Sequence, residues 1–172
     1  MTYTPILKGL ICTLAVISFC SQAQYKTLDP ADKNDIDAPR FWNEIEVTIP
    51  SAPPSKNLKQ FFVSVNTPLT FSIDTDSLTL GQDDVLRYVL VITSPSGAKQ
   101  ISYEGIRCEK YEWRLYATLI SDGQWRKNPT SKWQLIMPNS YNRYHSALVK
   151  DAFCENSIPR RNTKEIVQLL KP

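Results

Sequence analysis

The chain has 172 residues, of which 42% are hydrophobic and 22% are charged, as is typical of one globular domain. Its 20 basic and 17 acidic side chains leave a formal net charge of only +3. Because nucleic-acid binding needs a concentrated basic face, this near-neutral balance argues against that class of function.

The N-terminus has the parts of a signal peptide. Lys8 supplies a positive charge, residues 9–19 form an uninterrupted apolar run, and residues 21–23 (Ser-Gln-Ala) supply small side chains at the cleavage positions. The apolar run is too short to cross a bilayer as a helix. We therefore expect residues 1–23 to be removed, which leaves an exported chain without a transmembrane segment.

The same segment allows a second interpretation, in which Cys20 is lipidated and anchors the chain to a membrane. Residues 17–20 (Ile-Ser-Phe-Cys) loosely resemble a lipid-attachment motif. Phe19 argues against lipidation, since the residue before a lipidated cysteine is normally small.

Residues 24–40 are polar, rich in aspartate and interrupted by prolines. This composition predicts a flexible linker. No internal repeat or low-complexity tract follows, so residues 41–172 are expected to form a single domain.

The first part of that domain is predicted to form strands. Ile45, Val47 and Ile49 alternate with polar residues, as in a half-buried strand. Further short strands are expected over 61–65 and 70–73.

The clearest hairpin comes next. Residues 87–93 are apolar on both faces and rich in β-branched and aromatic side chains, which predicts a central strand. Residues 94–97 (Ser-Pro-Ser-Gly) predict a tight turn, and residues 99–106 form the returning strand.

Residues 111–119 carry the strongest alternation in the chain. The pattern places the following side chains on one face of a strand: Tyr111, Trp113, Leu115, Ala117 and Leu119. A hairpin turn at 121–124 is then expected to lead into a strand that begins near Trp125.

The C-terminal third changes to helical spacing. Asn139 or Ser140 can cap a helix with the following residues on its apolar face: Tyr141, Tyr144, His145, Leu148 and Ala152. A last helix is predicted to begin near Asn162, with Glu165 completing a capping box. The predicted fold class is therefore α+β, an antiparallel curved sheet or half-barrel with one or two C-terminal helices packed on it.

Cys108 and Cys154 are the cysteines that remain after removal of the signal peptide. In an oxidising compartment they predict a disulfide, worth about 4 kcal/mol in the chain-entropy model. Two buried thiols or two metal ligands are the alternatives. A metal is disfavoured because the chain has one histidine and lacks the cysteine spacing of zinc sites, and no glycine-rich loop indicates a nucleotide cofactor.

Several segments together resemble the CNP1-like family of exported Gram-negative proteins. They are residues 41–46 (FWNEIE) with the proline-rich stretch after them, 87–92 (RYVLVI) with 94–98 (SPSGA), 103–108 (YEGIRC), and 142–145 (NRYH) running to 153–154 (FC). The resemblance implies a small periplasmic protein or lipoprotein and carries over no activity. It strengthens the pairing of Cys108 with Cys154, and Phe19 departs from the lipoprotein-like members.

His145 is the only histidine, and so the only unperturbed side chain that titrates near neutral pH. It could serve as the general base of a small hydrolase, but no nucleophile-elbow motif is present. Its position on the apolar face of a helix favours a packing role. Two acidic pairs are interpreted as turn residues with solvated carboxylates rather than as glycosidase acids: Asp74/Asp76 and Asp83/Asp84.

Aromatic and basic residues are interleaved between positions 113 and 144, and such mixtures suit a binding surface. The expected binding residues are a polar cluster near the disulfide (Arg107, Arg143, Tyr144, His145) and two tryptophans that could equally be core (Trp125, Trp133). The predicted function is a non-enzymatic binding or accessory module of the cell envelope, with an envelope protein or a glycan as partner. A hydrolase that uses His145 and a structural assembly factor are the alternatives.

Overall fold

The structure, a computed structural model, describes residues 42–50, 54, 56–137 and 143–172. The predicted signal peptide (1–23) and linker (24–40) lie outside the described residues. So do Asn139, Ser140 and Tyr141, which were expected at the start of the first helix.

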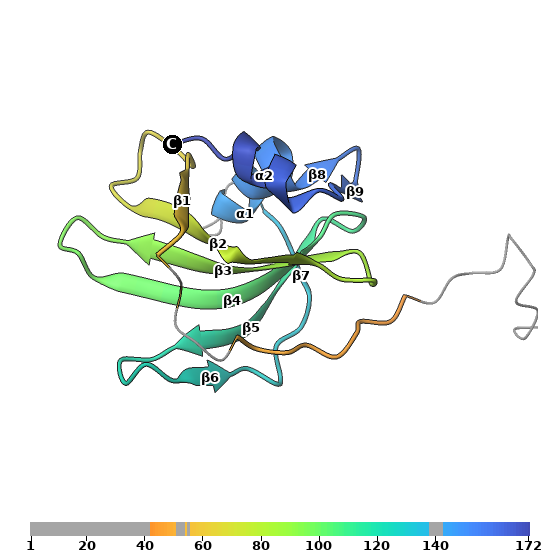
Figure 1. The fold of residues 1–172 in the computed structure, drawn as a ribbon, viewed down its shortest axis with the longest axis horizontal. Helices are drawn as coiled ribbons and strands as arrows, with labels where there is room; N and C mark the ends of the chain where they lie inside the picture. Colours follow the sequence, from red (N-terminus) through yellow and green to blue (C-terminus); the bar gives the residue numbers. More distant parts are fainter. Residues whose placement is uncertain (1–41, 51–53, 55, 138–142) are drawn as a thin grey trace, which may run out of the picture. The chain divides into compact units, whose positions relative to one another are not determined.

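An antiparallel sheet forms the centre of the described part (Figure 1). Its strands follow one another in chain order from β1 to β6, and β7 also pairs with β5. The strands are β1 (Leu58–Phe61), β2 (Thr70–Leu80), β3 (Val85–Thr93), β4 (Lys99–Arg107), β5 (Glu112–Leu119), β6 (Trp125–Lys127) and β7 (Gln134–Leu135). The sheet does not close, because β1 and β6 lie at opposite ends of the strand order.

β3 is the central strand that its apolar sequence predicts. Leu86, Tyr88 and Leu90 face a large core that includes the helices. Val89 and Val91 face a smaller core on the opposite side. Both faces of the sheet are therefore covered, as a run that is apolar on both faces requires.

The predicted hairpin turns are confirmed. The backbone N–H of Gly97 donates to the carbonyl oxygen of Ser94, and that of Gly123 donates to Ile120. Gly97 has φ of 85° and Gly123 has φ of 81°. Both lie in the left-handed region, where a side chain would be strained.

The predicted single apolar face of β5 is wrong, because a β-bulge interrupts the strand. Tyr103 pairs with Ala117 and Glu104 pairs with Leu115, so Tyr116 is an extra residue. Leu115 consequently packs on the helix-side core, whereas Ala117 and Tyr116 belong to the core on the other face. One inserted residue reverses the side of every residue that follows it.

Residues 42–50, here named the strap, do not form the strand that their alternation predicts. The strap has no regular secondary structure, and Ile45 is exposed. Val47 and Ile49 nevertheless pack against the smaller core. The alternating pattern therefore correctly indicates that one side of this segment is buried, but it does not show whether the segment pairs with a neighbouring strand.

Two strand boundaries also differ from expectation. The predicted strand at 61–65 ends at Phe61, and the predicted strand at 70–73 runs on to Leu80. β2 contains an irregularity between Asp74 and Thr79. There the Ser77 hydroxyl accepts the backbone N–H of Val89 at 2.8 Å, in the place of a ladder carbonyl.

Short helical segments cover one face of the sheet: α1 (Arg143–Leu148), the π-helical turn η1 (Val149–Phe153) and α2 (Thr163–Leu169) (Figure 1). α2 begins as predicted, because the Asn162 side chain accepts the backbone N–H of Lys164. Glu165 forms an ion pair with Arg160. The small hairpin of β8 (Cys154–Glu155) and β9 (Ile158–Pro159) connects η1 to α2.

The predicted disulfide is present between Cys108 and Cys154. Cys108 follows β4, and Cys154 begins β8 directly after η1. The bridge therefore ties the helical layer to the sheet. The architecture is mostly antiparallel sheet with short C-terminal helices, which is the coarse form of the predicted fold class.

Candidate functional site

A buried carboxylate organises the interface between the sheet and α1. Glu104 lies on β4, and its side chain is 3% exposed. Its Oε1 accepts the Ser102 hydroxyl at 2.6 Å and the Tyr144 hydroxyl at 3.3 Å. Its Oε2 accepts the Tyr88 hydroxyl at 3.2 Å and lies 2.8 Å from Nε2 of His145. A buried carboxylate with this many donors is fully satisfied.

His145 lies within this cluster and has no exposed surface. Its ring stacks on Trp113, with centroids 4.1 Å apart, and Tyr144 packs against it at the same distance. Burial raises the pKa of Tyr88 and Tyr144 well above their ordinary values, and the charge on Glu104 adds to this effect. Both tyrosines therefore remain neutral donors to the carboxylate at physiological pH.

The order of the polar groups differs from that of a catalytic triad. In a triad the imidazole lies between the hydroxyl and the acid. Here the acid Glu104 lies between the Ser102 hydroxyl and the His145 imidazole. The hydroxyl is therefore placed to satisfy the carboxylate, and not to give its proton to the histidine.

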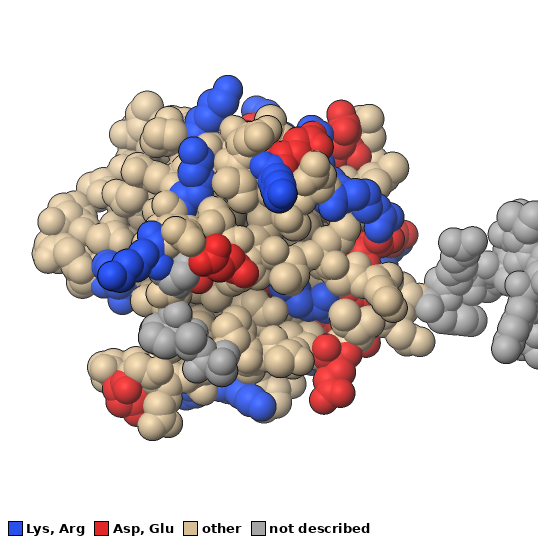
Figure 2. Space-filling view, viewed as in Figure 1, with Lys and Arg blue, Asp and Glu red and all other residues tan. Residues whose placement is uncertain are grey.

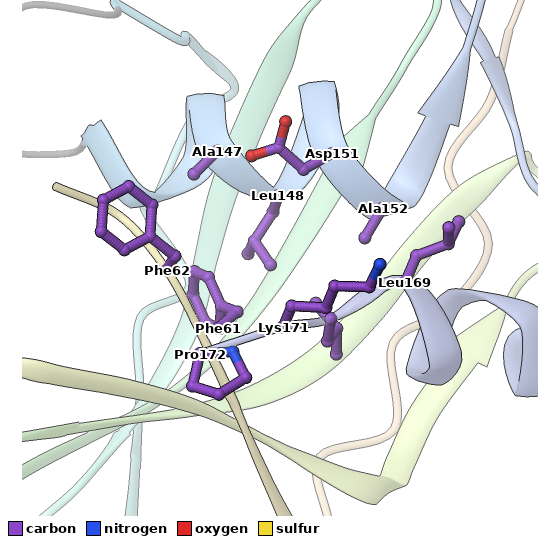
Figure 3. A pocket seen from close by; sticks show the side chains of 10 residues that line it. Phe61, Phe62, Ala147, Leu148, Asp151, Ala152, Leu169, Lys171 and Pro172 are labelled. Atoms are coloured by element: carbon purple, nitrogen blue, oxygen red, sulfur yellow. The ribbon is translucent and has the colours of Figure 1, made fainter.

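A largely apolar pocket of about 340 Å³ opens beside this cluster, between the end of β1, the α1–η1 helix and the C-terminal segment (Figure 3). Most of its lining side chains are apolar: Phe61, Phe62, Ala147, Leu148, Ala152, Leu169, Leu170 and Pro172. Asp151 and Lys171 add one charge of each sign. Its size is within the range of pockets that hold small ligands or anchoring side chains.

The local sequence explains why a hollow forms there. The helix presents the small side chains of Ala147 and Ala152 to the pocket, where larger residues would fill it (Figure 3). On the other side the backbone N–H of Phe62 donates to the carbonyl oxygen of Lys171 at 2.7 Å. This bond fixes the C-terminal segment beside the end of β1 and so forms the second wall.

Exposed apolar side chains lie at the rim of the pocket and on the connection that follows β1. Phe62 is 54% exposed and lines the pocket itself. Val65 and Leu69, on the connection from β1 to β2, are 85% and 38% exposed. A large exposed aromatic residue at the rim of an apolar pocket, such as Phe62, is typical of surfaces that bind a partner.

The family model of the CNP1-like family matches residues 37–171, which is most of the chain. The chain belongs to the CNP1-like family. No curated protein and no solved structure matches it. The family therefore accounts for the resembling segments at 41–46, 103–108 and 142–154, and it assigns no substrate or partner to this CNP1-like chain.

Three further observations concern membrane-spanning helices, metal-binding groups and surface charge in the CNP1-like domain. Within the described residues no helix is long and apolar enough to cross a membrane. The same residues contain no group of three or more side chains suited to holding a metal ion. On the face shown in Figure 2, lysine and arginine side chains are interspersed with acidic ones, in keeping with the near-neutral net charge.

The CNP1-like structure separates the polar cluster predicted near the disulfide. Tyr144 and His145 meet at Glu104. Arg107 instead lies 4.0 Å from the Trp42 ring and pairs with Glu109. The exposed Arg143 approaches the hydroxyl of Ser64 at 3.4 Å.

The two predicted tryptophans are both half-buried and lie on the strap side of the sheet. Trp125 packs against the smaller core. Trp133 packs edge-on against Trp42, and its Nε1 donates to Glu44 at 3.2 Å. Neither residue lines the apolar pocket.

Sequence reasoning missed the two glutamates that organise these clusters, Glu44 and Glu104. Each occupies an alternating polar position, where a solvent-facing side chain is the usual expectation. It also interpreted Asp83 as solvated, whereas Asp83 is 6% exposed and binds Arg87. The available signal for Asp83 was Arg87, four positions later, whereas the partners of Glu44 lie 43 to 89 positions away in the chain.

Proposed function

We propose that this CNP1-like protein is a non-enzymatic binding module of the periplasm, and that its apolar pocket receives an apolar segment of an envelope protein. One observation carries the proposal. Phe62 lines a pocket whose walls are mostly apolar, and it is itself half exposed.

The chemistry of the lining favours a peptide segment over a glycan. Sugar recognition needs several polar groups that converge on hydroxyls, whereas the polar side chains that line this pocket are Asp151 and Lys171. Aliphatic and aromatic side chains of a partner would instead find apolar walls. Their burial is worth about 25 cal/mol per Å² of apolar surface removed from water.

The environment of His145 supports the non-enzymatic part of the proposal. A general base must reach a substrate proton. His145 has no exposed surface, and its Nε2 faces the carboxylate of Glu104. A hydrolase built on this histidine would need Trp113 and Tyr144 to move away from its ring first.

Photo-crosslinking tests the binding role. A photoreactive residue at Phe62 is expected to give a specific adduct with one envelope protein in intact cells, while the same residue at Leu135 gives none. Leu135 is a matched control, because it is a 64% exposed aliphatic residue that does not line the pocket. Filling the pocket with Ala147→Phe should abolish the adduct. An adduct that survives this change contradicts the proposal.

Intact-mass measurement tests the location. A soluble periplasmic chain should begin at Gln24 and weigh less than its reduced form by two hydrogen atoms, because of the Cys108–Cys154 disulfide. A lipid-modified chain that begins at Cys20 would overturn the soluble assignment.

A further inference from the structure

The face of the sheet opposite the helices carries a second carboxylate cluster, which is partly buried and centred on Glu44 of the strap. Arg114 and Tyr116 donate to the two oxygens of Glu44. Trp133 donates through Nε1 at 3.2 Å, and Arg87 through Nη2 at 3.4 Å. The Glu44 side chain is only 14% exposed. Cationic and aromatic donors that converge on one carboxylate are the composition of an anion receptor.

The charges in this cluster balance only when a carboxylate is present. Arg87 and Arg114 each carry one positive charge. Asp83 neutralises Arg87 through two hydrogen bonds, of 3.0 and 2.6 Å. Glu44 is then the counter-ion of Arg114. Without Glu44 the cluster keeps one uncompensated positive charge, which a carboxylate from elsewhere could neutralise.

Side chains, and no strand ladder, attach the strap to the sheet. Trp42 donates through Nε1 to the carbonyl oxygen of Asp83 at 2.8 Å and lies under the guanidinium of Arg107. Val47 and Ile49 pack on the smaller core. None of the described residues 42–50 is part of a β-ladder. A segment attached in this way resembles a bound peptide more than a strand of the fold.

A groove of about 520 Å³ runs beside the strap. The strap forms one wall, and residues around the end of β6 form another, including Lys127, Asn128 and Pro129. Arg114 and Tyr116 line the groove as well as binding Glu44. Two of the four donors to Glu44 are therefore reachable from an open groove.

From these contacts we infer that Arg87, Arg114, Tyr116 and Trp133 form a carboxylate-binding site for an acidic, extended peptide segment, and that Glu44 of the strap occupies this site in place of the partner's glutamate. The strap gives the recognition pattern. It has a tryptophan two residues before the glutamate and aliphatic residues three and five positions after it. This site and the apolar pocket lie on opposite faces of the sheet. The proposal for the site therefore does not depend on the proposed function of the pocket.

The covalent attachment of the strap sets the threshold for a competitor. A tethered segment acts at an effective concentration on the order of millimolar for short linkers. A free peptide of equal intrinsic affinity must exceed that concentration to displace the strap. The wild-type chain should therefore bind such peptides weakly, and weakening the strap should expose the site.

The test uses the full exported chain and a fluorescent peptide with the sequence of residues 41–50. Glu44→Ala should bind the peptide at least tenfold more tightly than wild type, as measured by fluorescence anisotropy. The double variant Trp42→Ala/Glu44→Ala removes both anchors and should bind more tightly still. Asn43→Ala is the matched control, since Asn43 is an exposed residue of the strap that does not line the groove, and it should bind as weakly as wild type.

Two further comparisons identify the receptor groups. Adding Arg114→Ala to Glu44→Ala should lower peptide binding at least tenfold, as should glutamine in place of Glu44 in the peptide. Circular dichroism and an intact disulfide establish that each variant is folded. If Glu44→Ala unfolds, Glu44→Gln, which keeps the side-chain shape, replaces it and should also bind the peptide more tightly than wild type. The proposal is overturned if folded strap variants bind the peptide no better than wild type. It is also overturned if Arg114→Ala does not change the affinity for the peptide.

Discussion

Glu104 and Glu44 lie on opposite faces of one sheet, and among the described residues each is hydrogen-bonded to four side chains. Glu104 belongs to a central strand and is sealed beneath α1. Glu44 belongs to a segment without regular structure that crosses the other face. The position of Glu104 is thus set by the β-sheet to which its own residue belongs. The position of Glu44 is set mainly by the side chains that donate hydrogen bonds to it.

This difference separates a structural cluster from a site that can exchange its occupant. Two of the donors to Glu104, Tyr88 and Ser102, lie on strands of the sheet itself, so they stay beside the carboxylate while the sheet is intact. Removing Glu44 would require the release of side-chain contacts along the strap and of one hydrogen bond, from the backbone N–H of Ile45 to Asp83. Buried polar clusters with equal numbers of hydrogen bonds can therefore differ greatly in the free energy needed to open them.

The largest effect is expected from Glu104→Gln. The amide nitrogen turns one acceptor into a donor that faces other donors, so the buried cluster is no longer satisfied. The free energy of unfolding should fall by about 3–5 kcal/mol, as is typical when one partner of a buried cluster is lost. Urea denaturation measures it, with Glu46→Gln as control. A loss under about 1 kcal/mol would mean that the cluster is open to water.

Loss of the disulfide should act mainly on the helix side. The double variant Cys108→Ala/Cys154→Ala should lower the free energy of unfolding by about 2–4 kcal/mol. Hydrogen exchange should show that the amides of α1 and η1 lose more protection than the fall in global stability explains. The amides of the sheet strands beneath the strap should lose no more than that fall. Equal loosening of both faces would contradict the comparison.

The ion pair of Asp83 and Arg87 gives the strap side a pH dependence. Burial opposes the charge on Asp83, but hydrogen bonds from Arg87 and the backbone N–H of Ile45 hold the pKa of this carboxyl below its ordinary value. A lowered carboxyl pKa stabilises the fold above the unfolded-state pKa of about 3.9, and this stability is lost as the pH falls through the folded-state pKa.

Asp83→Asn should therefore cost about 1.5–3 kcal/mol between pH 5 and 7. The difference from wild type should shrink steadily as the pH is lowered below about 4. Denaturation curves collected across this range measure it. A difference that stays constant down to pH 2 would show that the loss comes from packing and not from charge.

The smallest effect is expected from Glu44→Gln. The side chain keeps its shape and one acceptor, and the groove admits water, so the loss should be about 1–2 kcal/mol. The fluorescence of Trp133 should change, because its indole donates to Glu44. If this variant is as unstable as Glu104→Gln, the strap is an integral part of the fold.

The sequence predicted the elements whose cause is local. β3 was recognisable because it is apolar on both faces, the turns because of Gly97 and Gly123, and α2 because of its Asn162 cap. The disulfide followed from the cysteine count and the expected compartment, and the resemblance supported it. Each of these signals lies within a few residues or depends on composition.

The bulge, the two glutamate clusters and the pocket were not predicted, because they depend on contacts between residues that are far apart in the chain or on features without a motif. The bulge at Tyr116 adds one residue, which a period-two pattern does not reveal. His145 and Glu104 are 41 positions apart, and Glu44 and Trp133 are 89 apart. The pocket at Phe62 arises from small residues on a helix and a bond to Lys171, and neither feature has a motif.

The π-helical turn η1 sets the direction in which the chain leaves the helix. The backbone N–H of Cys154 donates to the carbonyl oxygen of Val149, five residues back instead of four. Deleting one residue of the turn, such as the exposed Lys150, would place the same N–H and carbonyl oxygen at the regular spacing of four residues, so Cys154 should keep its place beside Cys108. The turn is thus one residue longer than the disulfide requires, and a homologue that lacks this residue should still carry both cysteines.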